Sequence, residues 1–346
     1  MDMIKNKPFL TDEKVDDFTV EDFVFVHRNE ELLDEAYTAT SYAKDVWMHF
    51  KKNKGAVIGA IIIIAIILLA IIGPMISGYK ADAINLDVQS LPPRIQGIYK
   101  LGIFSGYEKG VDQYAAHGVS QAFYWFGTDT NGRDLFTRVW EGTRVSLIIA
   151  LSAVVIDIVI GMSYGLISGY FGGKVDMVMQ RFMEILNGIP TLVVVTLLGL
   201  VLPPGITSIV FALMITGWIG MARISRAEVL KLKESEFILA SRTLGAKNFS
   251  IIFKEVMPNI FGQLIVMSMF SIPNAIFTEA FLSFVGLGIQ APDASLGSLI
   301  SDGYKSLTGH PHIIMSAIIV LALLMLSFNL FADGIRDAFD PNQKQR

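Results

Sequence analysis

The sequence predicts an all-α membrane protein in which six helices cross the bilayer. A mean hydropathy of +0.52 and a 52% share of hydrophobic residues are not those of an ordinary soluble domain. Several apolar runs reach the roughly 20 residues that a helix needs to span the hydrocarbon core. Basic residues gather in alternate loops between these runs, as expected for loops that stay inside the cell. These observations predict a multi-pass chain whose two termini lie on the same side of the membrane.

The expected crossings are six apolar runs, at approximately 56–76, 144–169, 180–201, 206–224, 261–286 and 313–332. The remaining segments are a cytoplasmic polar tail (1–40), an interfacial helix (41–55), an extracytoplasmic loop (77–143) and a cytoplasmic tail (342–346). Residues 144–341 form the core domain with the last five crossings. The chain does not begin with the basic region and adjacent apolar core of a cleaved signal peptide. We therefore expect the first apolar run to remain in the mature protein.

The distribution of charge predicts the orientation of these crossings. Lys51, Lys52 and Lys54 precede the first run and place the N-terminus inside the cell. The loop 202–206 has no charge and 287–312 has a single base, so both are expected outside. Most other bases lie in segments expected inside: Lys174, Arg181, Arg223, Arg226, Lys231, Lys233, Arg242, Lys247 and Lys254. The sequence therefore predicts cytoplasmic N- and C-termini.

The N-terminal composition excludes some partners and chemistries. Residues 1–36 carry eleven acidic and four basic residues, which is not a polybasic arm for nucleic acid. Segment 18–26 (FTVEDFVFV) is a candidate for pairing or docking. The chain contains no cysteine, which excludes disulfides and thiolate chemistry. In the segment that follows, the apolar residues Tyr42, Val46, Trp47 and Phe50 fall near one side of a helix, which is typical of an interfacial helix.

Between the fourth and fifth crossings, residues 226–259 form a charged, amphipathic segment. Its periodicity predicts two short helices joined at Gly245, where a left-handed residue can end the first helix. Asn248 is placed to cap the second helix and Pro258 to stop it. The expected apolar faces are Leu230, Phe237, Ala240 and Leu244 in the first half, and Phe249, Ile252, Phe253 and Val256 in the second. We expect a cytoplasmic hairpin that docks in a groove of a soluble partner, with the lipid surface as the alternative.

Motifs for enzymatic chemistry are incomplete. Residues 168–175 (SGYFGGKV) lack the first glycine and the final hydroxyl of a phosphate-binding loop, so we expect no ATP hydrolysis by this chain. His310 and His312 offer two ligands, which are too few for a metal site. Ser163 lies in a G-x-S-x-G pattern, but that motif needs a strand–turn–helix context and here falls inside an expected membrane helix. A serine hydrolase remains a minor alternative.

Small and charged residues inside the crossings are more informative. Gly161, Gly165 and Gly169 recur every four residues, which is typical of close helix packing in lipid. Asp157 falls near the middle of the second crossing and Glu279 in the outer half of the fifth. An acid there costs about 2.5–3.5 kcal/mol on insertion scales, so each should face protein or water. Each therefore belongs either to a polar pathway or subunit interface, or to a hydrogen bond inside the bundle.

The segment around Gly245 resembles the EAA loop of the membrane subunits of bacterial ABC importers, whose consensus is E-A-A-x3-G-x9-I-x-L-P. Ala240 and Pro258 keep the consensus spacing from Gly245, whereas four other consensus positions are replaced, by Leu239, Ser241, Glu255 and Met257. The resemblance implies that five residues couple the chain to an ATPase: Glu236, Ala240, Arg242, Gly245 and Pro258. Glu236 either replaces the displaced consensus glutamate or is only a solvated charge.

Three further stretches resemble the C-type subunit of oligopeptide and dipeptide permeases. They are FGTDTNGRDLFTRVWEGTRVSL (126–147), EAFLSFVGLG with the following SLG (279–288 and 295–297), and FNLFADGIRDAFDP (328–341). With the hairpin, these motifs occur in one order over residues 42–341. The resemblance implies the type I ABC importer permease fold and a location in the bacterial cell membrane.

The same resemblance implies partners and a function. The implied partners are a homologous second permease subunit in a heterodimer, two cytoplasmic ATPase subunits that hold ATP and Mg, and an extracytoplasmic peptide-binding protein. This chain itself would bind no cofactor and no nucleic acid, and would form half of the pathway of a peptide importer. The alternatives are a permease subunit for nickel or another small solute and, less favoured, a secondary transporter or the serine hydrolase.

Overall fold

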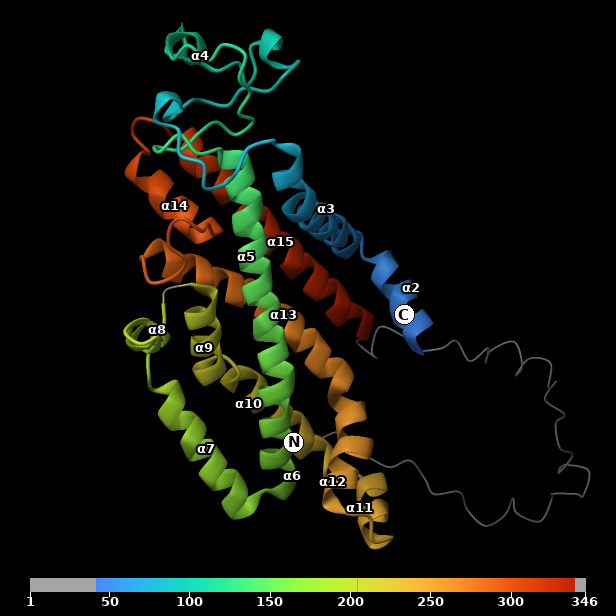
Figure 1. Cartoon of the computed structure of the whole chain (residues 1–346). Helices are drawn as coiled ribbons and strands as arrows, with labels where there is room; N and C mark the ends of the chain where they lie inside the picture. Colours follow the sequence, from blue (N-terminus) through green and yellow to red (C-terminus); the bar gives the residue numbers. More distant parts are fainter. Residues whose placement is uncertain (1–41, 204, 340–346) are drawn as a thin grey trace, which may run out of the picture. The chain divides into compact units, whose positions relative to one another are not determined.

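The computed structural model of the protein describes residues 42–203 and 205–339. Within these residues, five helical runs are long and apolar enough to cross a membrane (Figure 1). They are Lys54–Ile76, Leu135–Phe171, Ile206–Leu232, Asn248–Phe284 and His312–Phe339. The tails expected at 1–40, with segment 18–26, and at 342–346 lie outside the described residues.

The described part of the chain is mostly helical. In chain order, its helices are α2 (Tyr42–Lys52), α3 (Lys54–Ile76), η3 (Leu86–Val88), η4 (Tyr99–Leu101), α4 (Gln113–Ala116), α5 (Leu135–Ile156), η5 (Asp157–Met162), α6 (Ser163–Phe171), α7 (Gly173–Asn187), α8 (Thr191–Gly199), α9 (Ile206–Thr216), α10 (Ile219–Leu232), α11 (Glu236–Thr243), α12 (Asn248–Ile251), η6 (Ile252–Val256), α13 (Met257–Phe284), α14 (Leu296–Lys305) and α15 (His312–Phe339). Two short strands, β1 (Tyr107–Glu108) and β2 (Val111–Asp112), pair antiparallel.

The third expected crossing is not one straight helix. In place of a run over 180–201, α7 and α8 meet at a bend of 71°. Pro190 lies at this bend and precedes the first residue of α8. Proline lacks the backbone N–H that a continuing helix would use, and it disfavours helical geometry in the residue before it. The six-crossing prediction therefore holds only when this bent pair counts as one span.

The second crossing starts earlier than the expected residue 144. Asp134 caps α5, because its carboxylate accepts a hydrogen bond of 2.9 Å from the backbone N–H of Thr137. The helical run that follows has 37 residues and includes the π-helical turn η5. The apolar pattern alone missed the first nine residues because they include buried polar side chains such as Arg138.

The prediction that Pro258 stops a helix is wrong. Pro258 lies in the first turn of α13, inside one helical run of 37 residues from Asn248 to Phe284. The π-helical turn η6 comes directly before it, where the backbone N–H of Met257 bonds to the carbonyl of Ile252. A proline ring clashes with the carbonyl four residues earlier in a regular α-helix, and the wider π-turn accommodates it. The second half of the hairpin is thus continuous with the next crossing.

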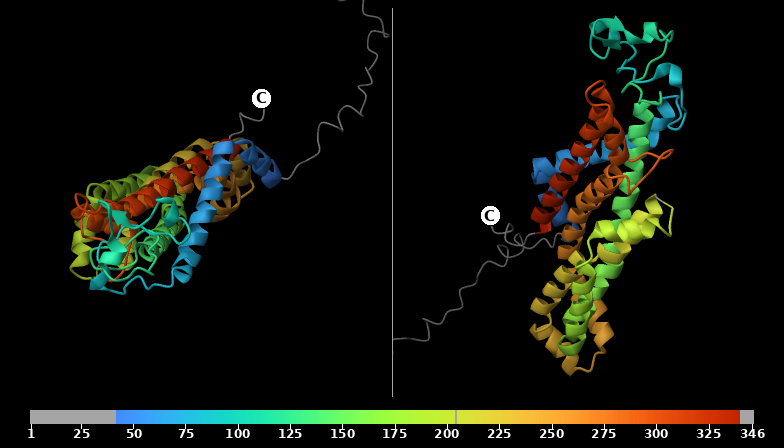
Figure 2. Two further views of the ribbon diagram at one scale, coloured as in Figure 1. Left: turned by 90° about the horizontal axis from the view of Figure 1, so that it is seen from above. Right: turned by 90° about the vertical axis from the view of Figure 1, so that its left-hand side faces the viewer.

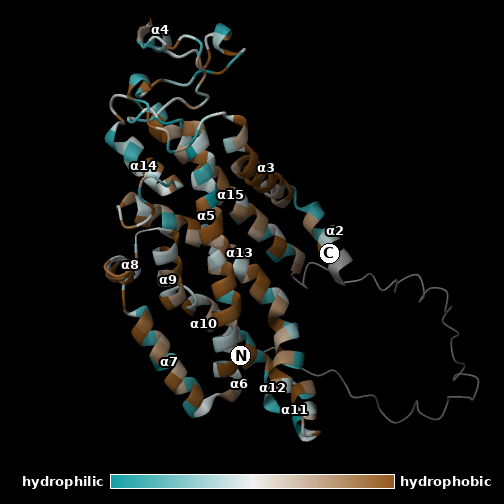
Figure 3. Ribbon diagram, viewed as in Figure 1, coloured by the Kyte–Doolittle hydropathy of each residue, from teal (hydrophilic) through white to brown (hydrophobic). Residues whose placement is uncertain are grey.

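The core of the molecule lies between the long helices. Helix α3 packs against α15 and α5, α13 packs against α15 and α5, and α10 packs against α6 (Figure 2). Ile149, Ile276 and Leu324, from three of these helices, are fully buried in one cluster. Hydrophobic residues cover the long helices, whereas hydrophilic residues gather near α2 and in the loops beside α4 (Figure 3). Side chains that a lipid bilayer would cover are correspondingly exposed, as at Ile61 and Leu151.

Candidate functional site

The hairpin between α10 and α13 turns at Gly245. Gly245 has φ +82°, which is the left-handed conformation that glycine adopts most readily. The backbone N–H of Ala246 donates to the carbonyl of Ser241 at 3.1 Å, and that of Gly245 donates to the carbonyl of Arg242 at 3.0 Å. These two bonds form a Schellman motif, which satisfies the last carbonyls of α11. The structure thus agrees with the expected left-handed end of the first hairpin helix.

The capping role expected of Asn248 is wrong. Lys247 occupies the N-cap position of α12, and Asn248 is the first residue of the helix. The Asn248 amide oxygen instead accepts a hydrogen bond of 3.2 Å from the hydroxyl of Tyr170 on α6. The guanidinium of Arg242 lies over the ring of the same tyrosine, 4.8 Å from its centroid. Tyr170 therefore holds both halves of the hairpin against the end of α6.

The apolar face expected to meet a partner is exposed only in part, because Ile252 and Val256 of that face are buried. Ile238, Ile251, Ile252 and Val256 are fully buried, together with residues of α6 and α10. The expected stripe ran through Leu230 into α11, but a turn separates α10 from α11, so the two helices do not share one periodicity. The exposed large apolar residues of the hairpin are Phe237, Leu239, Leu244, Phe249 and Phe253. Five large apolar side chains therefore cover its outer surface.

The predicted coupling residues lie on this exposed hairpin. Glu236 is exposed in the first turn of α11, where a negative charge interacts favourably with the helix dipole. Ala240 and Pro258 are also exposed, and Arg242 stacks on Tyr170 as described above. None of these described side chains is needed to fill the core, and all are accessible to a partner.

The glycine stripe of the second crossing packs against α10. A Cβ atom at Gly161 would lie 2.8 Å from the Cβ of Met221, and one at Gly165 would lie 2.5 Å from the Cβ of Ser225. At Gly169 it would lie 2.9 Å from the Cβ of Val229. These separations are far below van der Waals contact. The absence of side chains therefore lets the two helices approach closely, as is typical of helix pairs in lipid.

Ser163 is an intermediate-exposure residue at the start of α6, inside an uninterrupted helical run. The strand–turn–helix context of a nucleophile elbow is absent from the described chain at this position, so the serine hydrolase alternative loses its structural basis. Likewise, no group of three or more metal-binding side chains occurs among residues 42–203 and 205–339.

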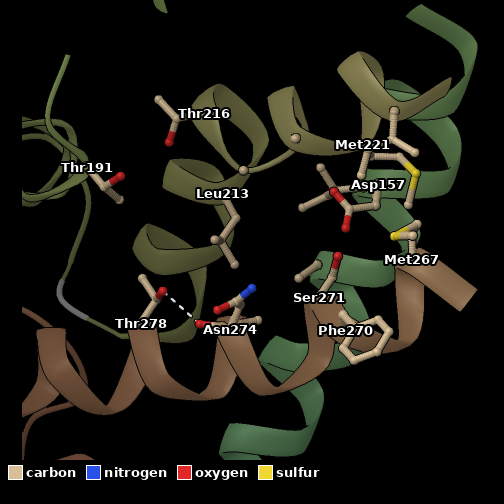
Figure 4. A pocket seen from close by; sticks show the side chains of 16 residues that line it. Asp157, Thr191, Leu213, Thr216, Met221, Met267, Phe270, Ser271, Asn274 and Thr278 are labelled. Atoms are coloured by element: carbon tan, nitrogen blue, oxygen red, sulfur yellow. Dashed lines mark hydrogen bonds between the residues drawn. The ribbon is translucent and has the colours of Figure 1, made fainter. Parts of the chain in front are cut away.

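A cavity of about 350 Å³ lies among α5, η5, α8, α9, α10 and α13. Asp157 lines it, together with the polar residues Thr191, Thr216, Ser271, Asn274 and Thr278 (Figure 4). Ser271, Asn274 and Thr278 follow one another at helical spacing along α13, and Asn274 is exposed. An exposed amide inside a membrane helix should face water or another protein. This polar stripe could have been found in the sequence as hydroxyl and amide residues at i, i+3 and i+7 within an apolar run.

Glu279 lies apart from this cavity, fully buried between α5 and α13. Its carboxylate accepts hydrogen bonds of 2.6 Å from Ser146 and 2.8 Å from Ser283. Ser283 also accepts the backbone N–H of Ile289, which ties the end of α13 to the next loop. Of the two readings left open by the sequence, this geometry favours the hydrogen bond inside the bundle. Asp157 and Glu279 thus have different surroundings.

The polar stretch before the second crossing forms a buried ionic network. Arg133 donates to the carboxylate of Asp129 at 2.6 Å, and Arg138 lies 3.6 Å from the same carboxylate. Arg138 also donates to the carbonyls of Ala81 (3.0 Å) and Pro292 (3.3 Å). These contacts join two loops to the start of α5. Burial also raises the pKa of the neighbouring Asp134 above its ordinary value, against the hydrogen bonds it accepts.

Comparisons with known proteins identify the family to which this chain belongs. Residues 161–345 match the family described as the binding-protein-dependent transport system inner membrane component. Residues 41–93 match the N-terminal TM domain of oligopeptide transport permease C. The chain belongs to the family of inner membrane components of binding-protein-dependent transport systems. Family membership and the helices confirm the expected all-α type I importer permease fold, and confirm a non-catalytic subunit that works with other subunits.

The relatives are permease proteins of bacteria. The chain is 40% identical to the dipeptide transport system permease protein DppC of Bacillus subtilis, over 98% of this chain and 100% of that protein. It is 45% identical to the DppC of Lactococcus lactis (90% and 93%) and 42% identical to the oligopeptide transport system permease protein OppC of B. subtilis (87% and 90%). A chain of the inward-facing MetNI methionine ABC transporter aligns with 59% of this chain at 18% identity and a TM-score of 0.49. The predicted resemblance to the C-type permease family is confirmed.

Proposed function

We propose that the chain is a permease subunit of an ATP-driven peptide importer and forms half of its translocation pathway. The three relatives described above are named as dipeptide and oligopeptide permeases, and they match most of the chain. The observation that carries the mechanism is the continuity of the hairpin with α13. One helical run of 37 residues joins the exposed hairpin to the polar stripe of the cavity.

In the proposed transporter, the hairpin contacts a cytoplasmic ATPase subunit. Its outer surface presents Phe249 and Phe253, whose rings are stacked, and Leu244, which is 88% exposed. Exposed apolar and aromatic side chains on a helix suit a groove of a partner protein. The chain has no phosphate-binding loop, so ATP and Mg belong to the two ATPase partners. The hairpin and both termini then lie in the cytoplasm, in agreement with the basic residues around them.

The cavity beside Asp157 is half of the pathway in this function. A homologous second permease subunit covers the open side of the cavity, which accounts for the exposed Asn274. An extracytoplasmic binding protein delivers the peptide to the opposite end of the molecule. ATP-driven closure of the ATPases moves the hairpin, and the continuous α12–η6–α13 run carries the movement to the cavity wall, because packed helices switch between discrete arrangements.

Uptake of a labelled tri-alanine peptide by the complete transporter in proteoliposomes tests this proposal. We expect uptake to require ATP inside the compartment that holds the ATPases, and to continue when ionophores remove ion gradients. Uptake that stops with the ion gradients, or that proceeds without ATP, would contradict the proposal and favour a secondary transporter.

A further inference from the structure

The cavity beside η5 holds a carboxylate without a basic partner in its wall. Among the described residues that line the cavity, Asp157 is the only ionisable one. This residue is 5% exposed, and its side chain points toward the hydroxyl of Ser271 (Figure 4). Carboxylates inside membrane segments are costly, and those that persist either pair with other groups of the bundle, as Glu279 does, or lie on a solute path. The wall therefore leaves a place for a cation supplied by a ligand.

The backbone at Asp157 is itself unusual. The π-helical turn η5 begins at this residue and interrupts an otherwise α-helical run of 37 residues. A π-turn inserts an extra residue into the helix, changes the direction of the following side chains, and is frequent at functional sites. The π-turn lies beside the cavity. At this turn Asp157 faces α13, whereas Gly161 and Gly165 face α10. The turn thus separates the residue of the cavity from the residues of the packing interface.

The rest of the cavity suits a ligand whose side chains vary. Its volume of about 350 Å³ falls within the range of small-molecule sites, roughly 300–1,000 Å³. Met221, Met267 and Phe270 contribute apolar surface, and methionine adapts to ligands of different shape. Ser271 and Asn274, with Thr278, add neutral polar groups on one wall. A single fixed charge with adaptable surroundings fits a ligand that always carries one cationic group.

We infer that this cavity binds the α-ammonium group of the transported peptide, with Asp157 as the counter-ion. This inference rests on the proposed function, because it takes a peptide as the substrate. The α-ammonium is common to peptides of every sequence, whereas a lysine side chain is present in only some of them. A permease that accepts many peptides gains attraction for all of them from one carboxylate, without selecting for side chains.

A reporter thiol measures the charge of the cavity directly. The chain contains no cysteine, so Asn274→Cys places its sole thiol in the cavity wall. In the assembled transporter, we expect the trimethylammonium methanethiosulfonate reagent to react about tenfold faster than the sulfonate reagent, relative to the same pair of reagents on Val201→Cys, a site outside the cavity. Tenfold corresponds to about 1.4 kcal/mol, the size of one partly screened charge contact.

Adding Asp157→Asn to the Asn274→Cys chain should abolish this preference, and adding it to the Val201→Cys chain should change nothing. Equal rates for the two reagents in the Asn274→Cys chain with Asp157 intact would overturn the inference. Complete protection of the thiol would also overturn it, because the partner subunit would then seal the cavity. Both of these outcomes are measured in a chain that retains Asp157, so they do not depend on the folding of the Asp157→Asn variant.

Peptide uptake identifies the ammonium that binds. We expect Asp157→Asn to lower uptake of both Ala-Ala-Ala and Ala-Lys-Ala at least tenfold, and Asp157→Glu to retain most of it, while the variants assemble with their partners. A loss confined to Ala-Lys-Ala would overturn the assignment to the α-ammonium. Unchanged uptake of both peptides by Asp157→Asn would overturn the inference while leaving the proposed function intact. Failure of the protein with Asp157 to import either peptide would contradict the proposed function itself.

Discussion

Two acidic residues of this chain show how the surroundings decide the use of an intramembrane carboxylate. Glu279 is fully buried and accepts hydrogen bonds from two serine hydroxyls. Asp157 lies at the wall of an open cavity with one serine beside it. Both cost insertion energy, and Glu279 recovers more of it within the chain because more hydroxyl groups donate to it. We therefore expect Glu279 to stabilise the bundle and Asp157 to be available to a ligand.

Replacing Glu279 should affect stability before it affects transport. We expect Glu279→Leu to lower the stability of the folded chain by about 1–3 kcal/mol, because Ser146 and Ser283 would lose the acceptor that they share. Glu279→Gln is the matched control, since its amide oxygen can still accept, and we expect a smaller loss. Thermal unfolding of the purified transporter in detergent measures both. Equal unfolding temperatures for Glu279→Leu and the parent protein, with impaired uptake, would instead place Glu279 in the pathway.

Sequence alone could not separate these two acids. Both interrupt apolar runs, and the hydroxyl partners of Glu279 lie on α5 and four residues along α13. The serine on α5 is 133 positions away in the chain, so local periodicity carries no information about it. Gly245 is the opposite case, because a left-handed end of α11 depends on a glycine at one position. The glycine turn was therefore predictable from one position, whereas the long-range pairing of Glu279 was not.

At the scale of elements, the second crossing and α10 form one closely packed pair. The four-residue glycine spacing predicted such packing, but it did not reveal which helix would be the partner. The structure identifies α10, whose backbone lies against Gly161, Gly165 and Gly169. The ion pair between Arg226 of α10 and Asp176 of α7, with two contacts of 2.6 Å, holds the same region together. These contacts therefore hold in place α10, the helix from which the hairpin begins.

A single methyl group should disturb this pair. A Cβ at Gly165 would lie 2.5 Å from the Cβ of Ser225, so we expect Gly165→Ala to lower stability by about 1–3 kcal/mol through overpacking. Gly199→Ala, also at a helical glycine, is the control, because no atom lies within 4 Å of its added Cβ. The two melting temperatures should differ by several degrees. If the two variants melt together, the close approach of α10 to the glycine stripe is refuted.

The helix boundaries were the weakest part of the expectation from sequence. Pro190 and Pro258 are both prolines near a crossing, yet the first breaks a span and the second lies within one. The difference comes from the π-turn η6, which accommodates Pro258. No residue pattern in the sequence predicts this turn. The apolar runs predicted that these crossings exist, and backbone geometry at the two prolines decides how they are joined.

At the scale of the whole molecule, the proposed mechanism needs a continuous helical connection between the hairpin and the cavity. The run from Asn248 to Phe284 supplies it, because the same helix begins at the hairpin and carries Asn274 at the cavity wall. The turn at Gly245, with φ +82°, sets the angle between α11 and this helical run. Proline cannot adopt that φ, whereas asparagine visits it at modest cost.

Reactivity of the thiol introduced by Asn274→Cys, measured in the assembled transporter, tests this coupling most directly. The rate of thiol labelling should change at least threefold when the ATPases are trapped with ATP and vanadate. With Gly245→Pro added, we expect the change to vanish while the chain still inserts and assembles, and with Gly245→Asn we expect it to persist. We therefore expect a nucleotide response that depends on the turn at Gly245. A full response in the Gly245→Pro chain would contradict it.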